Sequence, residues 1–303
     1  MNLSRLVLGC GNFGGIGSAP AFFGHGETEE EAFALMDAAW SLGIRTFDTA
    51  DAYGGGRSEQ WIGEWISTGG NRPVIVTKTF NPMEEGADKG LSRARMTRQL
   101  ESSLDRLGVD YIDVYLAHDF DAETPLDELV GTFEGLRELG LIKSWGVSNF
   151  DGGQLRELCE HGRPAFVENS YNLLERADDE DVIPLCAELG ISYLAFGALA
   201  GGLLTGRYRR GEEAPPGSRL ATRPEGYEHL VNDETFAGIE QLTAAAAERG
   251  ISPATLALAW ALARPGVTSA IIGARTQQHL GLALQALDVG LSAAEADALA
   301  QLF

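Results

Sequence analysis

Basic residues are scarce in this sequence, and lysine is the scarcest of them. The 303 residues include 44 acidic and 23 basic side chains, a formal net charge of −21, and lysine occurs only at Lys78, Lys89 and Lys143. Nucleic acids and anionic membranes bind basic surfaces, so this balance argues against both as partners. A phosphorylated ligand stays possible, because a few arginines at one place are enough to bind it.

Cysteines and long apolar runs are also few. Cys10, Cys159 and Cys186 are odd in number and widely spaced, so we expect neither a disulfide framework nor a metal site. The apolar run near Met1 is too short for a secretory signal, and no stretch of about 18 apolar residues predicts a membrane span. We therefore expect a soluble cytoplasmic protein. The sequence leaves its oligomeric state open.

What the sequence does contain is a regular alternation of short apolar runs and amphipathic helical segments. Periodicity, with glycine and proline at the breaks, predicts eight strands, each followed by helix. The predicted strands cover residues 6–9, 43–47, 74–77, 111–117, 142–148, 165–170, 191–196 and 267–272. Eight such units in one domain predict a (β/α)₈ TIM barrel over residues 1–303, with insertions after strands 1 and 7. A doubly wound open sheet is the alternative.

The glycine-rich insertion after the first strand bears on that alternative. Gly9, Gly11 and Gly14 match the G-x-G-x-x-G dinucleotide fingerprint. The fingerprint needs a helix that starts at the third glycine, but Gly17 and Pro20 would interrupt one. We therefore predict an irregular loop here, followed by a helix that starts near residue 28.

Polar side chains stand at the ends of three consecutive predicted strands. Asp48, Lys78 and His118 end strands 2, 3 and 4, and Tyr53 lies on the loop after Asp48. Active sites of TIM barrels lie at the carboxyl ends of the strands, so we expect these four to meet. A lysine ammonium stabilises a phenolate and lowers the pKa of a neighbouring tyrosine, a carboxylate keeps the lysine charged, and a histidine can donate a hydrogen bond to a carbonyl oxygen. This set predicts a general acid for carbonyl reduction, with hydride supplied by a nicotinamide cofactor.

The segment 47–54, Phe-Asp-Thr-Ala-Asp-Ala-Tyr-Gly, resembles the signature of the aldo-keto reductase superfamily, in particular its bacterial long-loop branch. Other blocks match in order along nearly the whole chain. They are Lys78 after an apolar strand, His118 in the segment 115–119, and the segments 146–150, 203–208 and 271–275.

The resemblance implies a role for each matching residue. Tyr53 would be the proton donor, Lys78 and Asp48 its tuning pair, and His118 the residue that orients the carbonyl. The implied cofactor-binding residues are Ser148, Asn149 and Glu168 at the carboxamide, Phe196 stacked on the nicotinamide ring with Leu199 in the same block, and Gly273 and Arg275 near the adenosine phosphate. An arginine at position 275 favours NADPH, with NADH possible.

Some positions depart from the family pattern. Glu168 stands where the family usually has glutamine, and it can accept from the carboxamide nitrogen but cannot donate. The block 196–199, Phe-Gly-Ala-Leu, replaces Tyr-Ser-Pro-Leu, and Leu282 and Ala283 stand where an acid and an asparagine often hold the adenine. These departures concern cofactor affinity and leave the implied reaction unchanged.

Other interpretations compete with these roles. Asp51 is the better candidate to cap the turn after strand 2, Ser148–Asn149 could cap the next helix, Phe196 could be ordinary core, and Arg275 could be a surface residue. As whole functions, a barrel glycosidase with Glu168 and Asp48 or Asp119 as its carboxylates, and a barrel that binds and senses NADPH without catalysis, are the alternatives.

The predicted substrate is a small carbonyl compound, in particular a sugar or aromatic aldehyde. Aromatic residues on the loop 11–26 are expected to form one wall of its pocket: Phe13, Phe22, Phe23 and His25. Phe80 and Phe120 follow two catalytic positions, and the arginine-rich stretch 206–232 is expected to act as a lid over cofactor or substrate.

Overall fold

Eight parallel strands form the centre of the molecule. The computed structural model describes residues 3–303. The strands are β1 (Leu6–Gly9), β2 (Thr46–Asp48), β3 (Val74–Thr79), β4 (Ile112–Ala117), β5 (Ile142–Ser148), β6 (Phe166–Ser170), β7 (Ser192–Phe196) and β8 (Val267–Ile272). Each pairs with the next, and β1 pairs with β8, so the sheet closes into a barrel. The predicted (β/α)₈ TIM barrel is confirmed, and the open sheet is excluded.

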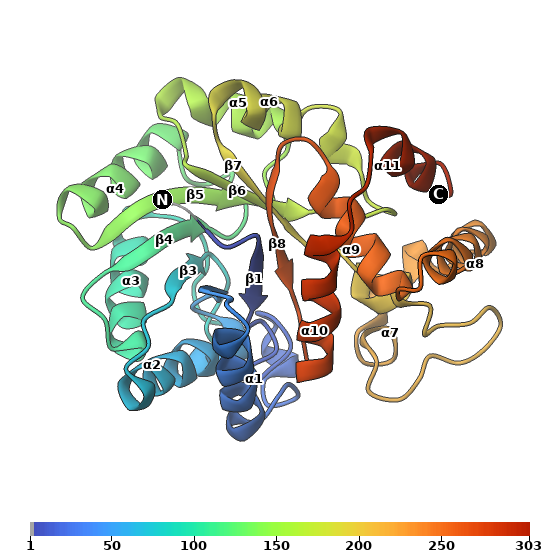
Figure 1. The fold of residues 1–303 in the computed structure, drawn as a ribbon. Helices are drawn as coiled ribbons and strands as arrows, with labels where there is room; N and C mark the ends of the chain where they lie inside the picture. Colours follow the sequence, from blue (N-terminus) through green and yellow to red (C-terminus); the bar gives the residue numbers. More distant parts are fainter. Residues whose placement is uncertain (1–2) are drawn as a thin grey trace.

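Helices surround the barrel and cover the outer faces of the strands (Figure 1). They are α1 (Glu29–Ser41), α2 (Arg57–Gly69), α3 (Arg93–Leu107), α4 (Leu126–Glu138), α5 (Gly152–His161), α6 (Val182–Leu189), α8 (Asp233–Glu248), α9 (Pro253–Ala263), α10 (Gln277–Gln285) and α11 (Ala293–Ala300). Local sequence sets several starts. Thr28 and Glu31 form a capping box at α1, as do Asp151 and Gln154 at α5.

Two long insertions lie at the carboxyl ends of β1 and β7. The first, residues 10–28, contains one short 3₁₀ helix, η1 (Pro20–Phe22), which fits the irregular loop expected there. The second runs from β7 to α8 and contains η4 (Ala200–Thr205), α7 (Arg219–Thr222), η5 (Pro224–Gly226) and η6 (Glu228–Leu230). The insertions meet: Arg219 Nη2 donates to Asn12 Oδ1 at 2.6 Å, and the Arg223 guanidinium lies 5.4 Å from the Phe22 ring centroid.

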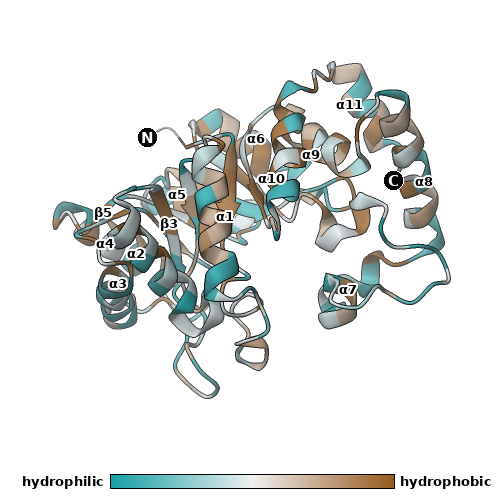
Figure 2. Ribbon diagram, turned by 60° about the horizontal axis from the view of Figure 1, so that its bottom comes forward, coloured by the Kyte–Doolittle hydropathy of each residue, from teal (hydrophilic) through white to brown (hydrophobic). Residues whose placement is uncertain are grey.

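The barrel has an apolar interior distinct from the layer between strands and helices. Val7, Val76, Val114, Leu116, Phe166, Leu194 and Ile271 form the interior cluster. Their sequence neighbours on the strands, such as Leu8 and Ile75, belong to the larger cluster that lies between the strands and the helices. Brown stretches of ribbon, the colour of hydrophobic residues, lie at the centre of Figure 2. Side chains alternate along a strand, so a residue two positions after an interior one also points inward.

This alternation places the candidate residues. Lys78 follows Val76, His118 follows Leu116, and Glu168 follows Phe166 by two positions. Each therefore points into the barrel just beyond the interior cluster, at the carboxyl end of its strand, where the barrel opens.

Two features are absent from the described residues. No helix in residues 3–303 has the length and apolar character that crossing a bilayer requires. Within the same residues no group of three or more His, Cys, Asp or Glu side chains could hold a metal ion.

Candidate active site

Lys78 is the centre of the site. Its side chain is fully buried, and its Nζ lies 2.7 Å from both Asp48 carboxylate oxygens and 3.1 Å from the Thr49 carbonyl oxygen. Glu168 Oε1 approaches the same nitrogen to 3.1 Å from across the barrel. Burial alone would lower the pKa of Lys78, but the two carboxylates outweigh it and the pKa lies well above its ordinary value. Lys78 is therefore charged at any working pH.

Tyr53 is held over this ammonium by a loop of glycines. It begins the 3₁₀ helix η2 (Tyr53–Gly56), where Gly54 adopts φ +60°. The loop packs directly on the first insertion: a Cβ on Gly15 would lie 2.7 Å from the Gly54 Cα. The Tyr53 ring centroid is 5.2 Å from Lys78 Nζ and 5.5 Å from the His118 ring, with the two rings edge to face.

The acidity of Tyr53 differs from the sequence-based expectation. Burial raises the pKa of Tyr53, and although Lys78 opposes this by charge and hydrogen bonding, the net pKa stays above its ordinary value. Lys78 therefore limits the rise instead of producing a net decrease, and Tyr53 keeps its proton at any working pH.

His118 is neutral and oriented. Burial, assisted by the Lys78 charge, lowers the pKa of His118 to about 3. Asn81 Nδ2 lies 3.3 Å from His118 Nδ1. Asn81 Nδ2 can only donate, so Nδ1 must accept and the imidazole proton must lie on Nε2. A neutral histidine with a protonated Nε2 can donate a hydrogen bond to a carbonyl oxygen.

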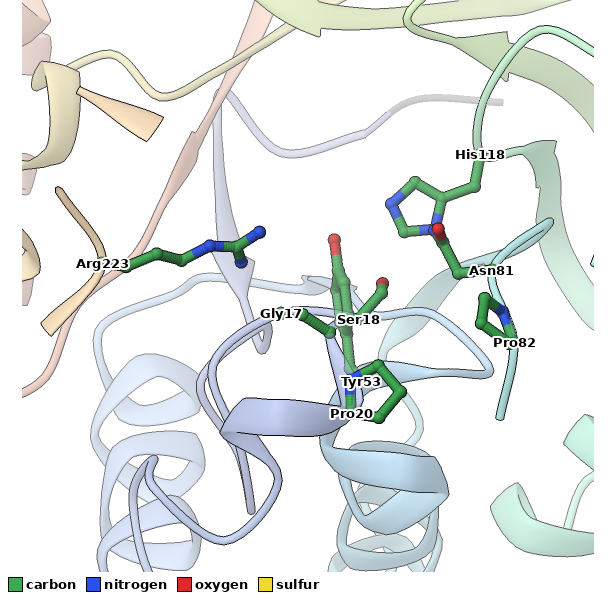
Figure 3. Close-up of a pocket in the computed structure, with 9 residues that line it drawn as sticks. Gly17, Ser18, Pro20, Tyr53, Asn81, Pro82, His118 and Arg223 are labelled. Carbon is green, nitrogen blue, oxygen red and sulfur yellow. The ribbon is translucent and has the colours of Figure 1, made fainter. Parts of the chain in front are cut away.

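A cavity of about 390 Å³ opens above these groups. It is lined by Gly17, Ser18, Ala19, Pro20, Tyr53, Asn81, Pro82, His118 and Arg223. Tyr53 lies between Arg223 on one side and His118 with Asn81 on the other (Figure 3). The wall from the first insertion is thus made by residues 17–20 and not by its aromatic residues, since Phe13 is buried in the core and neither Phe22, Phe23 nor His25 lines the cavity.

The predicted carboxamide-binding residues lie side by side on β5 and β6. Ser148 and Glu168 are register partners, and the Asn149 amide nitrogen donates to the Glu168 carbonyl oxygen at 3.1 Å. Asn149 has φ +60°, unusual for a residue with a side chain, and its Nδ2 donates to the His118 carbonyl oxygen at 2.8 Å. Glu168 Oε2 is buried with no hydrogen-bond partner among the described residues. A buried acceptor beside a serine hydroxyl and an asparagine amide fits a carboxamide ligand.

The other predicted cofactor residues are more dispersed. Phe196 is half-buried against the interior cluster, and Leu199 precedes η4. Gly273 follows β8 with nothing within 4 Å of where its Cβ would be. Arg275 Nε binds Glu27 Oε1 at 2.9 Å and Nη1 donates to the Gly217 carbonyl oxygen at 2.9 Å, so this arginine already has partners in both insertions.

Sequence reasoning missed several members of the site. Asn81 follows β3 by two residues, a position that could have marked it, whereas Glu27 carries no local signal. Arg223, which lines the cavity, was expected only as part of the arginine-rich stretch 206–232. Asp51, predicted as a turn cap, is fully buried and accepts from Thr79 Oγ1 at 2.6 Å, and burial raises its pKa to about 7. The glycosidase interpretation finds no support, because Glu168 and Asp48 bind the same ammonium and so cannot flank a glycosidic bond.

A (β/α)₈ barrel with a buried Asp–Lys pair, a tyrosine and a neutral histidine at its mouth fits the chemistry of an oxidoreductase. The Aldo/keto reductase family profile matches residues 5–303, and the chain belongs to that family and is an oxidoreductase of it. A relative named uncharacterized oxidoreductase YrpG, from Bacillus subtilis, is 35% identical over 96% of this chain and 89% of its own.

Two other comparisons extend this result. A probable voltage-gated potassium channel subunit beta from Oryza sativa is 34% identical over 88% of this chain and 85% of its own. The solved structure of the glycerol dehydrogenase AKR11B4 from Gluconobacter oxydans superposes with a TM-score of 0.84 at 28% identity, covering 99% of this chain and 91% of that one.

Proposed function

We propose that this protein reduces an aldehyde or ketone to an alcohol with NADPH, and that Tyr53 donates the proton. The observation that carries the proposal is the contact of Tyr53 with both Lys78 and His118 at the floor of one cavity. Carbonyl reduction places negative charge on one oxygen, and here a phenol and a neutral imidazole converge where such an oxygen would lie.

Each side chain has a distinct part in this reaction. His118 donates from Nε2 to the substrate oxygen and orients it. Tyr53 transfers its proton to that oxygen, and the Lys78 ammonium stabilises the phenolate that remains. Asp48 keeps Lys78 charged and aimed. Ser148, Asn149 and Glu168 would hold the carboxamide of the nicotinamide, which supplies the hydride.

The preference for NADPH depends on Arg275. Its side chain is about half exposed, so a 2′-phosphate could reach it, and a guanidinium binds phosphate well. Glu27 holds the same guanidinium, and burial raises the pKa of this carboxyl. We propose that NADPH binds by sharing Arg275 with Glu27, and that NADH is used less well. A cytoplasmic location, where NADPH is available, is part of this proposal.

The substrate class is proposed from the cavity. About 390 Å³ suits a small molecule, and the wall combines Ala19, Pro20 and Pro82 with hydrogen-bonding groups on Ser18 and Asn81. This mixture fits a hydroxylated or sugar aldehyde as well as a small aromatic one. The similarity to a glycerol dehydrogenase supports including small polyol aldehydes among the test substrates.

The first experiment is fluorescence titration with NADPH and NADH, followed by NADPH oxidation with glyceraldehyde and benzaldehyde. Tyr53→Phe should bind NADPH like the wild type and lose about 10²–10⁴-fold in kcat. Tyr111→Phe, which removes a phenol at the opposite end of the barrel, is the matched control. Absence of nucleotide binding by the wild type would overturn the proposal.

A second candidate role is a nicotinamide-binding subunit of a larger assembly. The relatives from Oryza sativa, Arabidopsis thaliana and Schizosaccharomyces pombe that are named potassium channel beta subunits favour it. This role predicts NADPH binding without turnover across a wide panel of carbonyl compounds. Turnover of any of them that depends on Tyr53 would instead support the reductase.

A further inference from the structure

Lys78 has more acceptors around it than it has protons. An ammonium carries three N–H bonds. Four oxygens lie within 3.1 Å of Lys78 Nζ: both Asp48 oxygens, the Thr49 carbonyl oxygen and Glu168 Oε1. The three N–H bonds cannot serve all four oxygens singly, which favours protonation of one carboxyl, because a protonated oxygen no longer needs a donor from Lys78.

The charges lead to the same conclusion. The Glu168 and Asp48 side chains are at most 4% exposed, and they share one ammonium. The other groups facing them are His118 from the end of β4, Tyr53 from η2 and the Cys10 thiol after β1, and none of these supplies a positive charge. A second buried carboxylate would have no counter-charge, which favours its protonated form.

The geometry also indicates which carboxyl holds the proton. Asp48 accepts two hydrogen bonds of 2.7 Å from Lys78, whereas Glu168 has one contact of 3.1 Å and a second oxygen without a partner among the described residues. Hydrogen bonds to the charged form stabilise it, so Asp48 is the carboxyl that is ionised and Glu168 is the one that keeps its proton.

We propose that Glu168 is a positioning residue that carries an exchangeable proton and returns it to Tyr53 through Lys78 after each reduction. The inference rests on the proposed function. Tyr53 gives its proton to the alkoxide and becomes a phenolate, Lys78 Nζ gives a proton to the phenolate, and the Glu168 carboxyl gives its proton to the Lys78 amine. The result is a Glu168 carboxylate paired with a Lys78 ammonium, and a proton from solvent then restores Glu168.

The relay predicts opposite pH dependence for the two directions of the reaction. Burial and the Asp48 charge raise the pKa of Glu168 to about 8. Reduction needs the protonated form, so kcat should fall as the pH rises through about 8. Alcohol oxidation needs Glu168 as the proton acceptor, so its kcat should rise through the same range.

Glu168→Gln tests the relay, because glutamine keeps the shape and one acceptor but carries no transferable proton. We expect kcat of reduction at neutral pH to fall about tenfold or more, with both pH transitions lost. Glu59→Gln is the matched control, since Glu59 is a fully buried carboxylate paired with Arg106 outside the site. A Glu168→Gln enzyme that retains both transitions would overturn the proposal.

A second measurement does not require turnover. Infrared difference spectra of the cofactor-free protein between about pH 6 and about pH 10 should show the C=O band of a protonated carboxyl that disappears with rising pH. Asp51, whose pKa is raised to about 7, contributes a band of its own, so Glu168→Gln should lose the part that disappears near pH 8, and Glu59→Gln should keep both parts. Absence of the part that depends on Glu168 from the wild type at neutral pH would also overturn the proposal. If the part of the band that depends on Glu168 is present but no carbonyl compound is reduced, the proposed function has failed and the proton assignment stands.

Discussion

Charge is used differently in the barrel mouth and in the insertions above it. In the mouth, Lys78, Asp48 and Glu168 are at most 4% exposed and lie on rigid strands. Above the mouth, Arg219 and Arg223 in the second insertion and Arg275 after β8 connect the loops with partly exposed side chains, and the Arg275 side chain is 51% exposed. Buried charges act at low dielectric and exposed ones are screened by water and salt. The mouth is therefore suited to chemistry, whereas the charged contacts between the loops above it are weak and sensitive to salt.

The largest effect is expected at the centre of the mouth. Lys78→Met leaves Asp48 and Glu168 buried together without a cation, and breaking a buried ion pair in this way costs about 3–5 kcal/mol of stability. We also expect reduction to become undetectable, because no charge remains to stabilise the Tyr53 phenolate. Chemical denaturation and NADPH oxidation measure the two effects.

Lys89→Met is the matched control for this change. Lys89 is exposed, so its loss should leave both stability and turnover close to the wild type. A Lys78→Met protein as stable as Lys89→Met would show that the buried charges are not coupled as described.

The next effect concerns His118. Removing a hydrogen-bond donor to a developing oxyanion costs about 10²–10³-fold in kcat, and His118→Gln should lose part of this, because the glutamine amide can donate but lacks the ring that Asn81 holds in place. Because the pKa of His118 is lowered to about 3, wild-type kcat/KM should show no transition near the ordinary histidine pKa of about 6.5. His161→Gln, at the exposed end of α5, is the control. A transition near pH 6.5 that disappears in His118→Gln would contradict the neutral assignment.

The lowered pKa of His118 also predicts the direction in which stability changes with pH. Its pKa is lower in the folded than in the unfolded state, so its contribution is complete above about pH 6.5 and is lost as the pH falls toward about 3. Glu168 and Asp51 have raised pKa values, so their contributions are lost in the opposite direction, as the pH rises. Denaturation of His118→Gln and wild type between about pH 4 and pH 7 should therefore differ most at the acid end.

The insertions should give smaller effects that depend on salt. Arg275→Ala should weaken NADPH binding about tenfold and NADH binding less, because only NADPH has a 2′-phosphate. The difference should shrink as ionic strength rises, since this arginine is half exposed. Titration of both nucleotides at low and high salt measures it. If the affinities for NADPH and NADH fell equally, Arg275 would only hold the loops together and would not bind the 2′-phosphate.

The smallest effect is expected at Arg210. It pairs with Asp233 at 3.2 Å, and the two side chains are 45% and 85% exposed. Exposed pairs contribute about 0–1 kcal/mol, so Arg210→Gln should leave stability and turnover nearly unchanged. A clear loss of activity would show that the Arg210–Asp233 pair in the second insertion contributes to catalysis.

The same contrast explains what the sequence could predict. Apolar runs mark the strand ends, and strict alternation then fixes the direction in which Lys78, His118 and Glu168 point. The meeting of Asp48, Lys78 and His118 at the ends of β2, β3 and β4 therefore followed from the barrel. Even there, the start of β2 was placed three residues too early, because Gly43 and Ile44 look like strand residues but form the turn after α1.

Contacts among the loops above the barrel mouth could not be predicted. The Arg275–Glu27 pair connects residues 248 positions apart, and the Arg219–Asn12 pair connects residues 207 positions apart. Neither pair is indicated by any periodic pattern in the sequence. The contact of both Glu168 and Asp48 with the Lys78 ammonium was not predicted, for a different reason. Glu168 stands where the family resemblance implies a cofactor ligand, and its contact with Lys78 appears only once β6 and β3 face each other across the barrel.

The distribution of lysines has a practical consequence for attaching this protein to a surface. Of the three lysines, Lys78 is fully buried, whereas Lys89 and Lys143 are exposed. Amine-directed reagents should therefore spare the reaction centre. Lys143 is the second residue of β5, at the end of the barrel opposite the mouth, and Lys89 lies on the loop after β3. A Lys89→Arg protein would couple at Lys143 as its sole accessible lysine among the described residues, with the cavity facing the solution.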